Sequence, residues 1–292
     1  MRILITGGQG RLGRELQVAF AAQTVWAPDE PELDVTDAAA VGREVDAFRP
    51  ELVIHAAAYT DTRGCETDRD RATRVNGDGT RNVALACRRV GATLLYISTN
   101  EVFDGAKGEP YQETDEPRAI NAYGSSKLLG EQHVRSLFHK AYIVRTAWLY
   151  GGGSDFPAKV LQAGSGELRM VTDEVASPTW ARDLAEAIAR LVERGAPAGI
   201  YHLTNGGHCS RFEWAKQVLA LARRQDVVLG PITQAEYNAL DRKLDREPIR
   251  KPPFSALANT AAAALGVVLR LWPEALAAYF AVAPTGGRAP SA

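Results

Sequence analysis

The sequence has few cysteines and no long apolar run. Its cysteines, Cys65, Cys87 and Cys209, are odd in number and widely spaced, and they form no CxxC or zinc-type pattern. Reduced thiols are therefore expected, as is typical of the cytoplasm. No apolar run approaches the roughly 20 residues that a membrane-spanning helix needs. The apolar stretch that follows Met1 is too short for a signal peptide. We expect a cytoplasmic protein with no membrane segment.

The sequence also lacks an excess of charge of either sign. It has 34 basic and 35 acidic residues and a formal net charge of −1, and no basic cluster is long enough to indicate nucleic-acid binding. A local site could still hold an acidic nucleotide. No metal site is expected, because no metal-ligand spacing relates the histidines to one another or to Cys209; they are His55, His133, His139, His202 and His208.

Short β-rich runs alternate with helical patterns over the first 150 residues. The expected strands are residues 2–6, 24–27, 52–58, 93–98 and 141–146. The expected helices begin near residue 11 and cover 38–48, 73–89 and 121–135. This alternation predicts βαβ units, and hence an α/β fold with a Rossmann-type doubly wound parallel sheet.

After residue 150 the alternation of strands and helices becomes less regular. Helices are expected at 183–194 and 212–223, a strand at 199–203 and a proline-rich loop at 248–254. We predict a dinucleotide-binding Rossmann domain at 1–150 and a smaller mixed α/β substrate-binding domain at 151–283. Segments near 176–200 are expected to return to the first domain, and residues 284–292 to form a disordered tail.

Residues 6–13, TGGQGRLG, join the first strand to the first helix. Gly7, Gly10 and Gly13 have the spacing GxxGxxG, which permits a tight turn, close approach to a pyrophosphate and close helix–strand packing. The helix N-terminus adds oriented N–H groups for the phosphates. Arg11 and Leu12 lie between the last two glycines, so all five residues belong to the predicted cofactor site. The alternative is a purely structural turn.

An acidic residue is expected about 20 positions after the glycine turn, where it accepts hydrogen bonds from the adenosine ribose. Asp29 and Asp34 are both candidates, and Asp34, with Val35 beside it, is better placed for the adenine. A carboxylate at the ribose repels a 2′-phosphate and favours NAD. Arg11 could instead pair with that phosphate and favour NADP. The cofactor is therefore NAD or NADP, with NADH slightly favoured.

Tyr123 and Lys127 are four residues apart on an expected helix and so share one face. An ammonium beside a phenol favours the phenolate and lowers its pKa towards the working range of an acid–base catalyst. Alone, the pair could be an ordinary surface pair. The glycine turn upstream and the polar strand end at Ser98 and Thr99 make a catalytic role the better interpretation.

These motifs together are similar to the short-chain dehydrogenase/reductase superfamily. Within its extended branch, the chain resembles the dTDP-4-dehydrorhamnose reductase family from residue 1 to about residue 276. The matching segments include MRILITGGQGRLG, VIHAAAYT, ISTNEVFDG, NAYGSSKLLGE, IVRTAWLYG and VASPTWARDLAEAI. The resemblance implies reduction, by NAD(P)H, of the 4-keto group of a nucleotide-linked 6-deoxyhexose. Tyr123 would then protonate the alkoxide, Lys127 would lower the Tyr123 pKa and hold the nicotinamide ribose, and Thr99 would polarise the carbonyl.

The resemblance also implies roles for residues outside the catalytic trio. Trp148 would line the sugar pocket, unless it is only a packed core aromatic. Asn76 would brace the backbone of the active site, unless it only starts a helix. The residues that would run along the cofactor are Ala56, Ala57, Ala58 and Tyr59.

The chain departs from the family at positions that should face the sugar. Asn100 and Glu101 stand where the family usually has Asp-Tyr, and Thr62-Arg63 stands where it usually has Val-Asp. Glu30 replaces a common arginine and weakens the case for a 2′-phosphate. We therefore predict Thr62, Asn100, Glu101 and Trp148 as substrate contacts for an altered hexose or an altered product stereochemistry.

Two other functions are compatible with the same motifs. One is an epimerase or dehydratase of the superfamily, because Asn100-Glu101 resembles the acidic pair of the dehydratases. The other is a non-catalytic regulatory subunit, related to the partner protein of methionine adenosyltransferase. The amphipathic helices of the first domain also offer a surface for a homodimer, which the sequence does not decide.

Overall fold

The computed structural model describes residues 1–244 and 248–282, so the tail predicted at 284–292 lies outside the described residues. Six parallel strands form the central sheet in the order β10-β5-β4-β3-β1-β2. They are β1 (Arg2–Thr6), β2 (Thr24–Trp26), β3 (Leu52–His55), β4 (Thr93–Thr99), β5 (Ala141–Thr146) and β10 (Gly199–His202). The chain places β2 and β3 on opposite sides of β1, which makes the end of β1 a switch point where ligands bind in such sheets. The predicted α/β fold with a doubly wound parallel sheet is confirmed.

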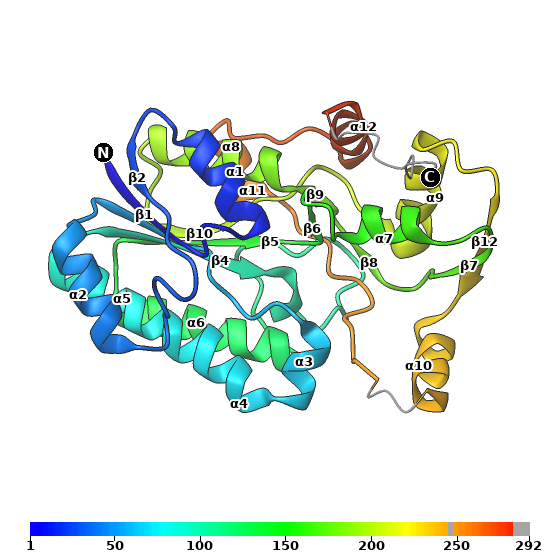
Figure 1. The fold of residues 1–292 in the computed structure, drawn as a ribbon, viewed down its shortest axis with the longest axis horizontal. Helices are drawn as coiled ribbons and strands as arrows, with labels where there is room; N and C mark the ends of the chain where they lie inside the picture. The colour runs from blue at the N-terminus through cyan, green and yellow to red at the C-terminus, as the bar shows by residue number, and fades with distance from the viewer. Residues whose placement is uncertain (245–247, 283–292) are drawn as a thin grey trace, which may run out of the picture.

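Helices cover both faces of this sheet, as Figure 1 shows. The helices on one face are α2 (Ala38–Phe48), α5 (Gly79–Val90) and α6 (Ala122–Leu137). Those on the other face are α1 (Arg11–Ala19), α8 (Ala181–Glu193) and α11 (Thr260–Ala264). Because both faces are covered, the strands are nearly continuous apolar runs: Ile3 and Ile5 pack on the α1/α8 side and Leu4 packs on the α2/α5 side.

The remaining elements lie mostly beyond one end of the sheet (Figure 1) and pack around an aromatic cluster that includes Tyr150, Trp180 and Trp214. Three two-stranded pairs occur here: β6 (Leu149–Tyr150) with β9 (Thr179–Trp180), β7 (Gly166–Val171) with β12 (Val227–Ile232), and β8 (Val175–Ala176) with β11 (Cys209–Ser210). The helices are α7 (Phe156–Gln162), α9 (Arg211–Leu221), α10 (Gln234–Lys243) and α12 (Trp272–Val282). Strand β10 and helix α8 come from beyond residue 175 and yet belong to the large sheet layer. The domain boundaries at 1–150 and 151–283 stay a prediction.

The structure differs from the expected helix at 73–89. Two short helices, α3 (Thr62–Thr67) and α4 (Arg69–Ala72), precede a π-helical segment, η1 (Thr73–Asp78), which then leads into α5. Inside η1 the side chain of Asn76 bonds to groups outside its own helix. The widened turn is typical of a functional position in a helix. Period-3.6 patterning could not reveal it.

The strand expected at 52–58 is also shorter than predicted, because β3 ends at His55 and residues 56–58 run on as irregular chain. Conversely, β4 is one residue longer than predicted and includes Thr99, after which η2 (Asn100–Val102) forms a 3-10 turn. Residues 56–58 and 100–102 therefore both leave the sheet at its carboxyl edge. Among the helices in the described part of the chain, none combines the length and the apolar character needed to cross a bilayer.

Candidate active site

A cavity of about 870 Å³ lies at the carboxyl ends of β1, β3, β4 and β5. It brings together nearly all of the residues predicted from the sequence. Those on its wall are Gly7, Gly10, Arg11, Leu12, Gly13, Asp29, Asp34, Val35, Ala56, Ala57, Ala58, Tyr59, Thr62, Thr99, Asn100, Glu101, Tyr123, Lys127 and Trp148. Asn76 is the predicted site residue that does not reach the wall.

The glycine turn is packed too closely for side chains. Gly7 has φ +72, and a Cβ there would lie 2.8 Å from the backbone nitrogen of Ala57, two residues after β3 ends. A Cβ on Gly13 would lie 2.2 Å from the carbonyl oxygen of Gly7. The turn after β1 and the chain after β3 thus meet backbone to backbone, which leaves the first N–H groups of α1 open to the cavity.

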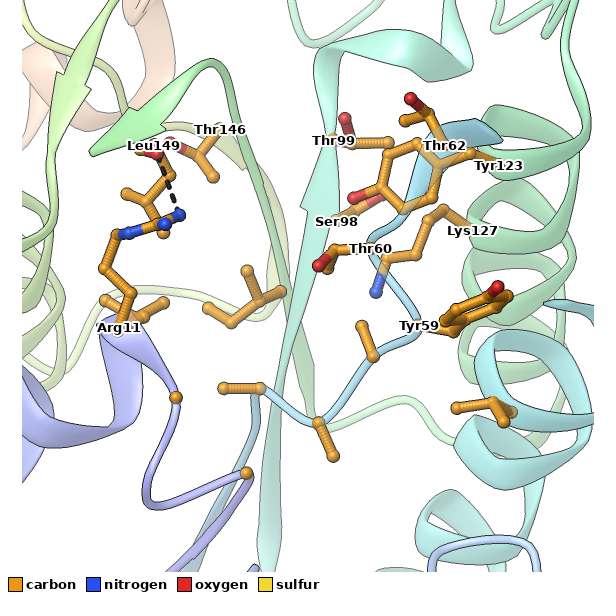
Figure 2. Close-up of a pocket in the computed structure, with 18 of the residues that line it drawn as sticks. Arg11, Tyr59, Thr60, Thr62, Ser98, Thr99, Tyr123, Lys127, Thr146 and Leu149 are labelled. Atoms are coloured by element: carbon orange, nitrogen blue, oxygen red, sulfur yellow. Dashed lines mark hydrogen bonds between the residues drawn. The ribbon is translucent and has the colours of Figure 1, made fainter. Parts of the chain in front are cut away.

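The wall beside this turn contains unsatisfied polar atoms. Nε of Arg11 and Oγ1 of Thr146 are buried and have no hydrogen-bond partner among the described residues. The guanidinium of Arg11 lies along the same side of the cavity as Leu149 and donates to its carbonyl oxygen at 3.1 Å (Figure 2). Orphaned donors, glycines without room for a Cβ and the small residues Ala56, Ala57 and Ala58 fit a polar, flat ligand such as a dinucleotide.

Carboxylates surround the end of the cavity near β2. Asp29 accepts a hydrogen bond from the backbone N–H of Gln9, in the glycine turn, at 3.2 Å. Asp34 accepts from the N–H and the hydroxyl of Thr36, both at 2.8 Å. Glu30 lines the same wall. The side chain of Arg11 extends away from these carboxylates, towards β6, and Arg71 and Arg74 also line the cavity.

Asn76 lies behind the wall and is fully buried. Its Oδ1 accepts from the N–H of Tyr59 at 2.8 Å, and its Nδ2 donates to the carbonyl oxygen of Tyr59 and to the hydroxyl of Ser126. It therefore ties the cavity-lining chain after β3 to helix α6. This is a bracing position, and any part of Asn76 in cofactor binding would act through Tyr59.

His55 ends β3 and is also fully buried. Its Nδ1 lies 2.7 Å from the Thr6 hydroxyl and its Nε2 lies 3.1 Å from the Thr80 hydroxyl. The Thr80 hydroxyl donates to the carbonyl oxygen of Asn76, so it accepts from Nε2, and the tautomer carries its proton there. Burial lowers the His55 pKa to about 3, helped by the charge of Lys127. His55 is thus a neutral structural group that joins β1, β3 and α5.

Tyr123, Thr99 and Lys127 meet on one side of the cavity, opposite Arg11 (Figure 2). Asn121 caps α6 by accepting from the N–H of Gly124 at 2.7 Å, which places Tyr123 in the first turn. Burial raises the Tyr123 pKa well above its ordinary value, the Glu101 carboxylate raises it further, and a hydrogen bond with the Thr99 side chain lowers it.

The influence of Lys127 differs from the expected one. Burial lowers the Lys127 pKa to about 7, although the Glu131 carboxylate raises it. Its Nζ lies 4.3 Å from the centre of the Tyr96 ring. The main influences on the Tyr123 pKa are burial, Glu101 and Thr99, and not the Lys127 charge. Lys127 is poised between its charged and neutral forms near neutral pH.

A buried ion pair lies about one helical turn beyond Lys127 on α6. Arg145 and Glu131 are joined by two hydrogen bonds, Nε to Oε1 at 2.9 Å and Nη2 to Oε2 at 2.7 Å, and both side chains are 1% exposed. The Ser98 hydroxyl donates to Oε1 of Glu131 at 2.5 Å. Ser98 therefore connects the polar end of β4 to this pair.

Asn100 and Glu101 reach the cavity wall, but their polar groups already have partners. Asn100 donates to the hydroxyl of Ser255 at 2.6 Å. Glu101 accepts from Nζ of Lys251 at 2.8 Å and from Nδ2 of Asn121 at 2.7 Å. Both side chains bind the segment 251–255. Lys251 lines the cavity too and was missed in the sequence, because a lysine in a proline-rich loop carries no local signal.

Aromatic side chains form the far end of the cavity. Trp148 stacks on Trp214 with ring centres 5.5 Å apart, and the guanidinium carbon of Arg211 lies 3.6 Å from the Trp148 ring centre. Trp148 is therefore packed against Trp214 and also lines the cavity, and its contact with a sugar stays a prediction. Further wall residues that the sequence analysis missed are Phe156, Lys159, Arg211 and Trp214. They come from α7 and α9, whose places in the fold could not be predicted.

At the other altered position, Thr62 lines the cavity at the start of α3. Its neighbour Arg63 turns towards α10 and pairs with Asp241 at 2.7 Å. In the described part of the chain no three His, Cys, Asp or Glu side chains are grouped as a metal ion would require.

Known proteins of the family that the sequence resembles match nearly the whole chain. The model of the family described as RmlD substrate binding domain matches residues 1–283. A dTDP-4-dehydrorhamnose reductase of Mycobacterium tuberculosis is 38% identical, with 96% of this chain and 92% of the relative covered.

Two solved structures are similar in fold and sequence. A dTDP-4-dehydrorhamnose reductase of Clostridium acetobutylicum superposes with a TM-score of 0.90 at 36% identity, covering 96% of this chain and 99% of the other. A dTDP-4-dehydrorhamnose reductase of Bacillus anthracis, solved in complex with NADP, superposes with a TM-score of 0.89 at 36% identity, covering 96% and 98%.

Proposed function

The chain belongs to the dTDP-4-dehydrorhamnose reductase family, and from this premise we propose that it reduces the 4-keto group of a nucleotide-linked, dTDP-type 4-keto-6-deoxyhexose. The observation that carries the proposal is the single cavity in which the glycine turn and the Thr99–Tyr123–Lys127 trio face each other. The glycine turn and residues 56–59 would hold a cofactor on the side of the cavity that leads to the trio. NAD(P)H supplies the hydride when bound.

Each residue of the trio has a separate role in proton transfer or in binding. Tyr123 donates its phenolic proton to the oxygen that becomes an alkoxide when hydride reaches C4. Burial raises the Tyr123 pKa and keeps its phenol protonated, so Tyr123 carries the proton that it donates. Thr99, which lowers the Tyr123 pKa, hydrogen-bonds the same substrate oxygen and stabilises developing charge. Lys127 holds the nicotinamide ribose and, when charged, assists loss of the proton.

Among the cofactor residues, we assign the phosphates to the N–H groups of the glycine turn and α1, with Gly7, Gly10, Arg11, Leu12 and Gly13 around them. Asp29 binds the adenosine ribose, and Asp34 and Val35 lie at the adenine. Three carboxylates, Asp29, Glu30 and Asp34, surround this end, and the charge of Arg11 is directed elsewhere. A 2′-phosphate would be repelled, so we propose that NADH is preferred to NADPH.

The aromatic end of the cavity would receive the nucleotide sugar. Trp148 offers a ring face and Thr62 a hydroxyl to the hexose. Arg211 and Lys159 place positive charge on the part of the wall that would contact the diphosphate of the nucleotide sugar. Asn100 and Glu101 shape the sugar end, although their polar groups are turned to the segment 251–255.

One assay separates this function from its rivals. Purified protein is incubated with a panel of dTDP-4-keto-6-deoxyhexoses and NADH or NADPH, and the nicotinamide absorbance is followed while the sugars are analysed. Stoichiometric cofactor oxidation with a reduced sugar supports the proposal. Product without net oxidation would indicate an epimerase or dehydratase. Tight cofactor binding with no turnover of any sugar would indicate a non-catalytic subunit. The cytoplasmic location and a homodimer stay predictions.

A further inference from the structure

Lys251 joins the proline-rich segment to the catalytic side of the cavity. Its Nζ lies 2.8 Å from Oε1 of Glu101, and the two side chains are 15% and 11% exposed. Oε2 of Glu101 accepts from Nδ2 of Asn121, the same residue that caps α6. The carboxylate of Glu101 is thus held between the loop at 248–254 and the start of the helix that carries Tyr123.

The first turn of α6 is in tight contact with η2. A Cβ built on Gly124 would lie 2.0 Å from the carbonyl oxygen of Glu101. Tyr123 is the neighbour of Gly124, and it is the Glu101 carboxylate, among nearby charges, that most raises the Tyr123 pKa. A negative charge that varied here would change how readily Tyr123 releases its proton.

Resting on the proposed reduction, we propose that Lys251 and Glu101 form a charge pair that controls proton donation by Tyr123. Lys251 neutralises the carboxylate that would otherwise face the phenol unpaired. Both are positioning residues in this scheme, because they act through Tyr123 and not on the sugar. Asn100 supports the pair by holding Ser255, four residues beyond Lys251, at 2.6 Å.

Other ionisable groups packed around Tyr123 do not take over the role proposed for Lys251 and Glu101. Those on neighbouring elements are Tyr96 on β4, Cys65 and Glu66 on α3 and Lys127 on α6. Burial raises the Cys65 pKa to about 11, so Cys65 stays neutral in the working range. Burial also raises the Tyr96 pKa well above its ordinary value. Glu66 caps α6 by accepting from the N–H of Ala122. The charged groups that remain to influence proton release by Tyr123 are Glu101, Lys251 and Lys127.

The test compares Lys251→Met, Glu101→Gln and the double variant in pH–rate profiles of sugar reduction. Two groups lower the rate as the pH rises: Lys127, whose pKa is about 7, and Tyr123, which must be protonated to act as an acid. Because burial raises the Tyr123 pKa, Tyr123 sets the higher alkaline limb. Removing Lys251 leaves Glu101 unpaired and should move this limb up by about 1 pH unit. Removing the carboxylate should move it down by a similar amount. The double variant should return close to the wild-type limb, because both charges are gone.

Three further variants separate control of Tyr123 from simple structural support. Lys251→Arg keeps the charge and should retain the wild-type limb, and Lys251→Gln replaces Lys251→Met if that variant does not fold. Lys107→Met removes a comparable ion pair with Asp115 outside the cavity wall and serves as the matched control. Shifts in the same direction for Lys251→Met and Glu101→Gln, or no shift in either, would overturn the proposal even if both variants melt earlier.

A second readout does not depend on the sugar. In the NAD⁺ complex, the ¹³C signal of labelled tyrosine that disappears in Tyr123→Phe is titrated in each variant. The same opposite shifts are expected in its midpoint. If no nucleotide sugar is turned over but these shifts appear, the proposed function fails and the charge pair stands. If turnover is normal and the midpoint is the same in all variants, the charge pair fails alone.

Discussion

Replacing Glu131 by glutamine should destabilise the protein strongly, although the change is almost isosteric. Glu131 and Arg145 form a buried pair with two short hydrogen bonds, and Ser98 donates to the same carboxylate. In Glu131→Gln one carboxylate oxygen becomes an NH₂ group that faces the donors of Arg145. The guanidinium is then left buried with an uncompensated charge, which costs about 3–5 kcal/mol. For a chain of this length we expect the melting temperature to fall by about 6–10 °C.

The measurement is thermal unfolding of the cofactor-free protein followed by circular dichroism. A companion variant, Glu131→Leu combined with Arg145→Met, removes both charges and replaces them with apolar side chains of similar volume. It should recover most of the lost stability, because neither desolvated charge remains. A melting temperature of Glu131→Gln within about 1 °C of wild type would refute the reasoning. So would a double variant that is no more stable than the single one.

The same substitution should also affect Lys127. The Glu131 carboxylate raises the Lys127 pKa, which burial has lowered to about 7. Without that carboxylate the pKa falls below 7, so less than half of Lys127 is charged at pH 7. If charged Lys127 holds the cofactor ribose, affinity for NADH at pH 7 should fall and should recover towards pH 6. Fluorescence titrations at the two pH values measure this.

Three further predictions concern the cavity itself. Tyr123→Phe should lower kcat about 10³-fold while the Kd for NADH, measured by fluorescence, stays within about twofold of wild type; retained turnover would contradict the acid assignment. Gly13→Ala should weaken NADH binding more than tenfold in the same titration, because its Cβ would lie 2.2 Å from the Gly7 carbonyl oxygen; unchanged affinity would contradict a cofactor site at this turn. Asp29→Ser keeps an acceptor for the N–H of Gln9 but removes a charge, so the ratio of kcat/KM for NADPH to that for NADH should rise about tenfold; an unchanged ratio would remove Asp29 from cofactor selection.

The parallel sheet and the motifs that meet at the cavity could be predicted from the sequence because both depend on local patterns. Strand β5 and helix α2 were predicted with the bounds that the structure has. Glycine spacing in a strand–turn–helix context and the four-residue spacing of Tyr123 and Lys127 are likewise readable within one window of the chain. These residues meet because parallel strands bring their carboxyl ends to one edge of the sheet.

Residues that depend on long-range packing were not predictable. Lys251 meets Glu101 across 150 positions of sequence, and Arg211 meets Trp148 from a helix whose docking no local pattern encodes. Asn76 was expected either to brace the backbone of the active site or to start a helix, and its contacts with Tyr59 and Ser126 inside a π-helical turn became visible only in three dimensions. The altered residues Asn100 and Glu101 were noticed in the sequence, but their partners became visible only in three dimensions.

The measurement that tests the central claim most directly is the fate of the hydride. The protein is incubated with dTDP-4-keto-6-deoxyhexose and NADH carrying deuterium at the transferable C4 position, and the sugar is analysed by NMR and mass spectrometry. We predict one deuterium at C4 of the hexose for each NADH oxidised. A sugar product without deuterium, or oxidation of NADH without a reduced sugar, would contradict the assignment of this chain as a nucleotide-sugar 4-ketoreductase.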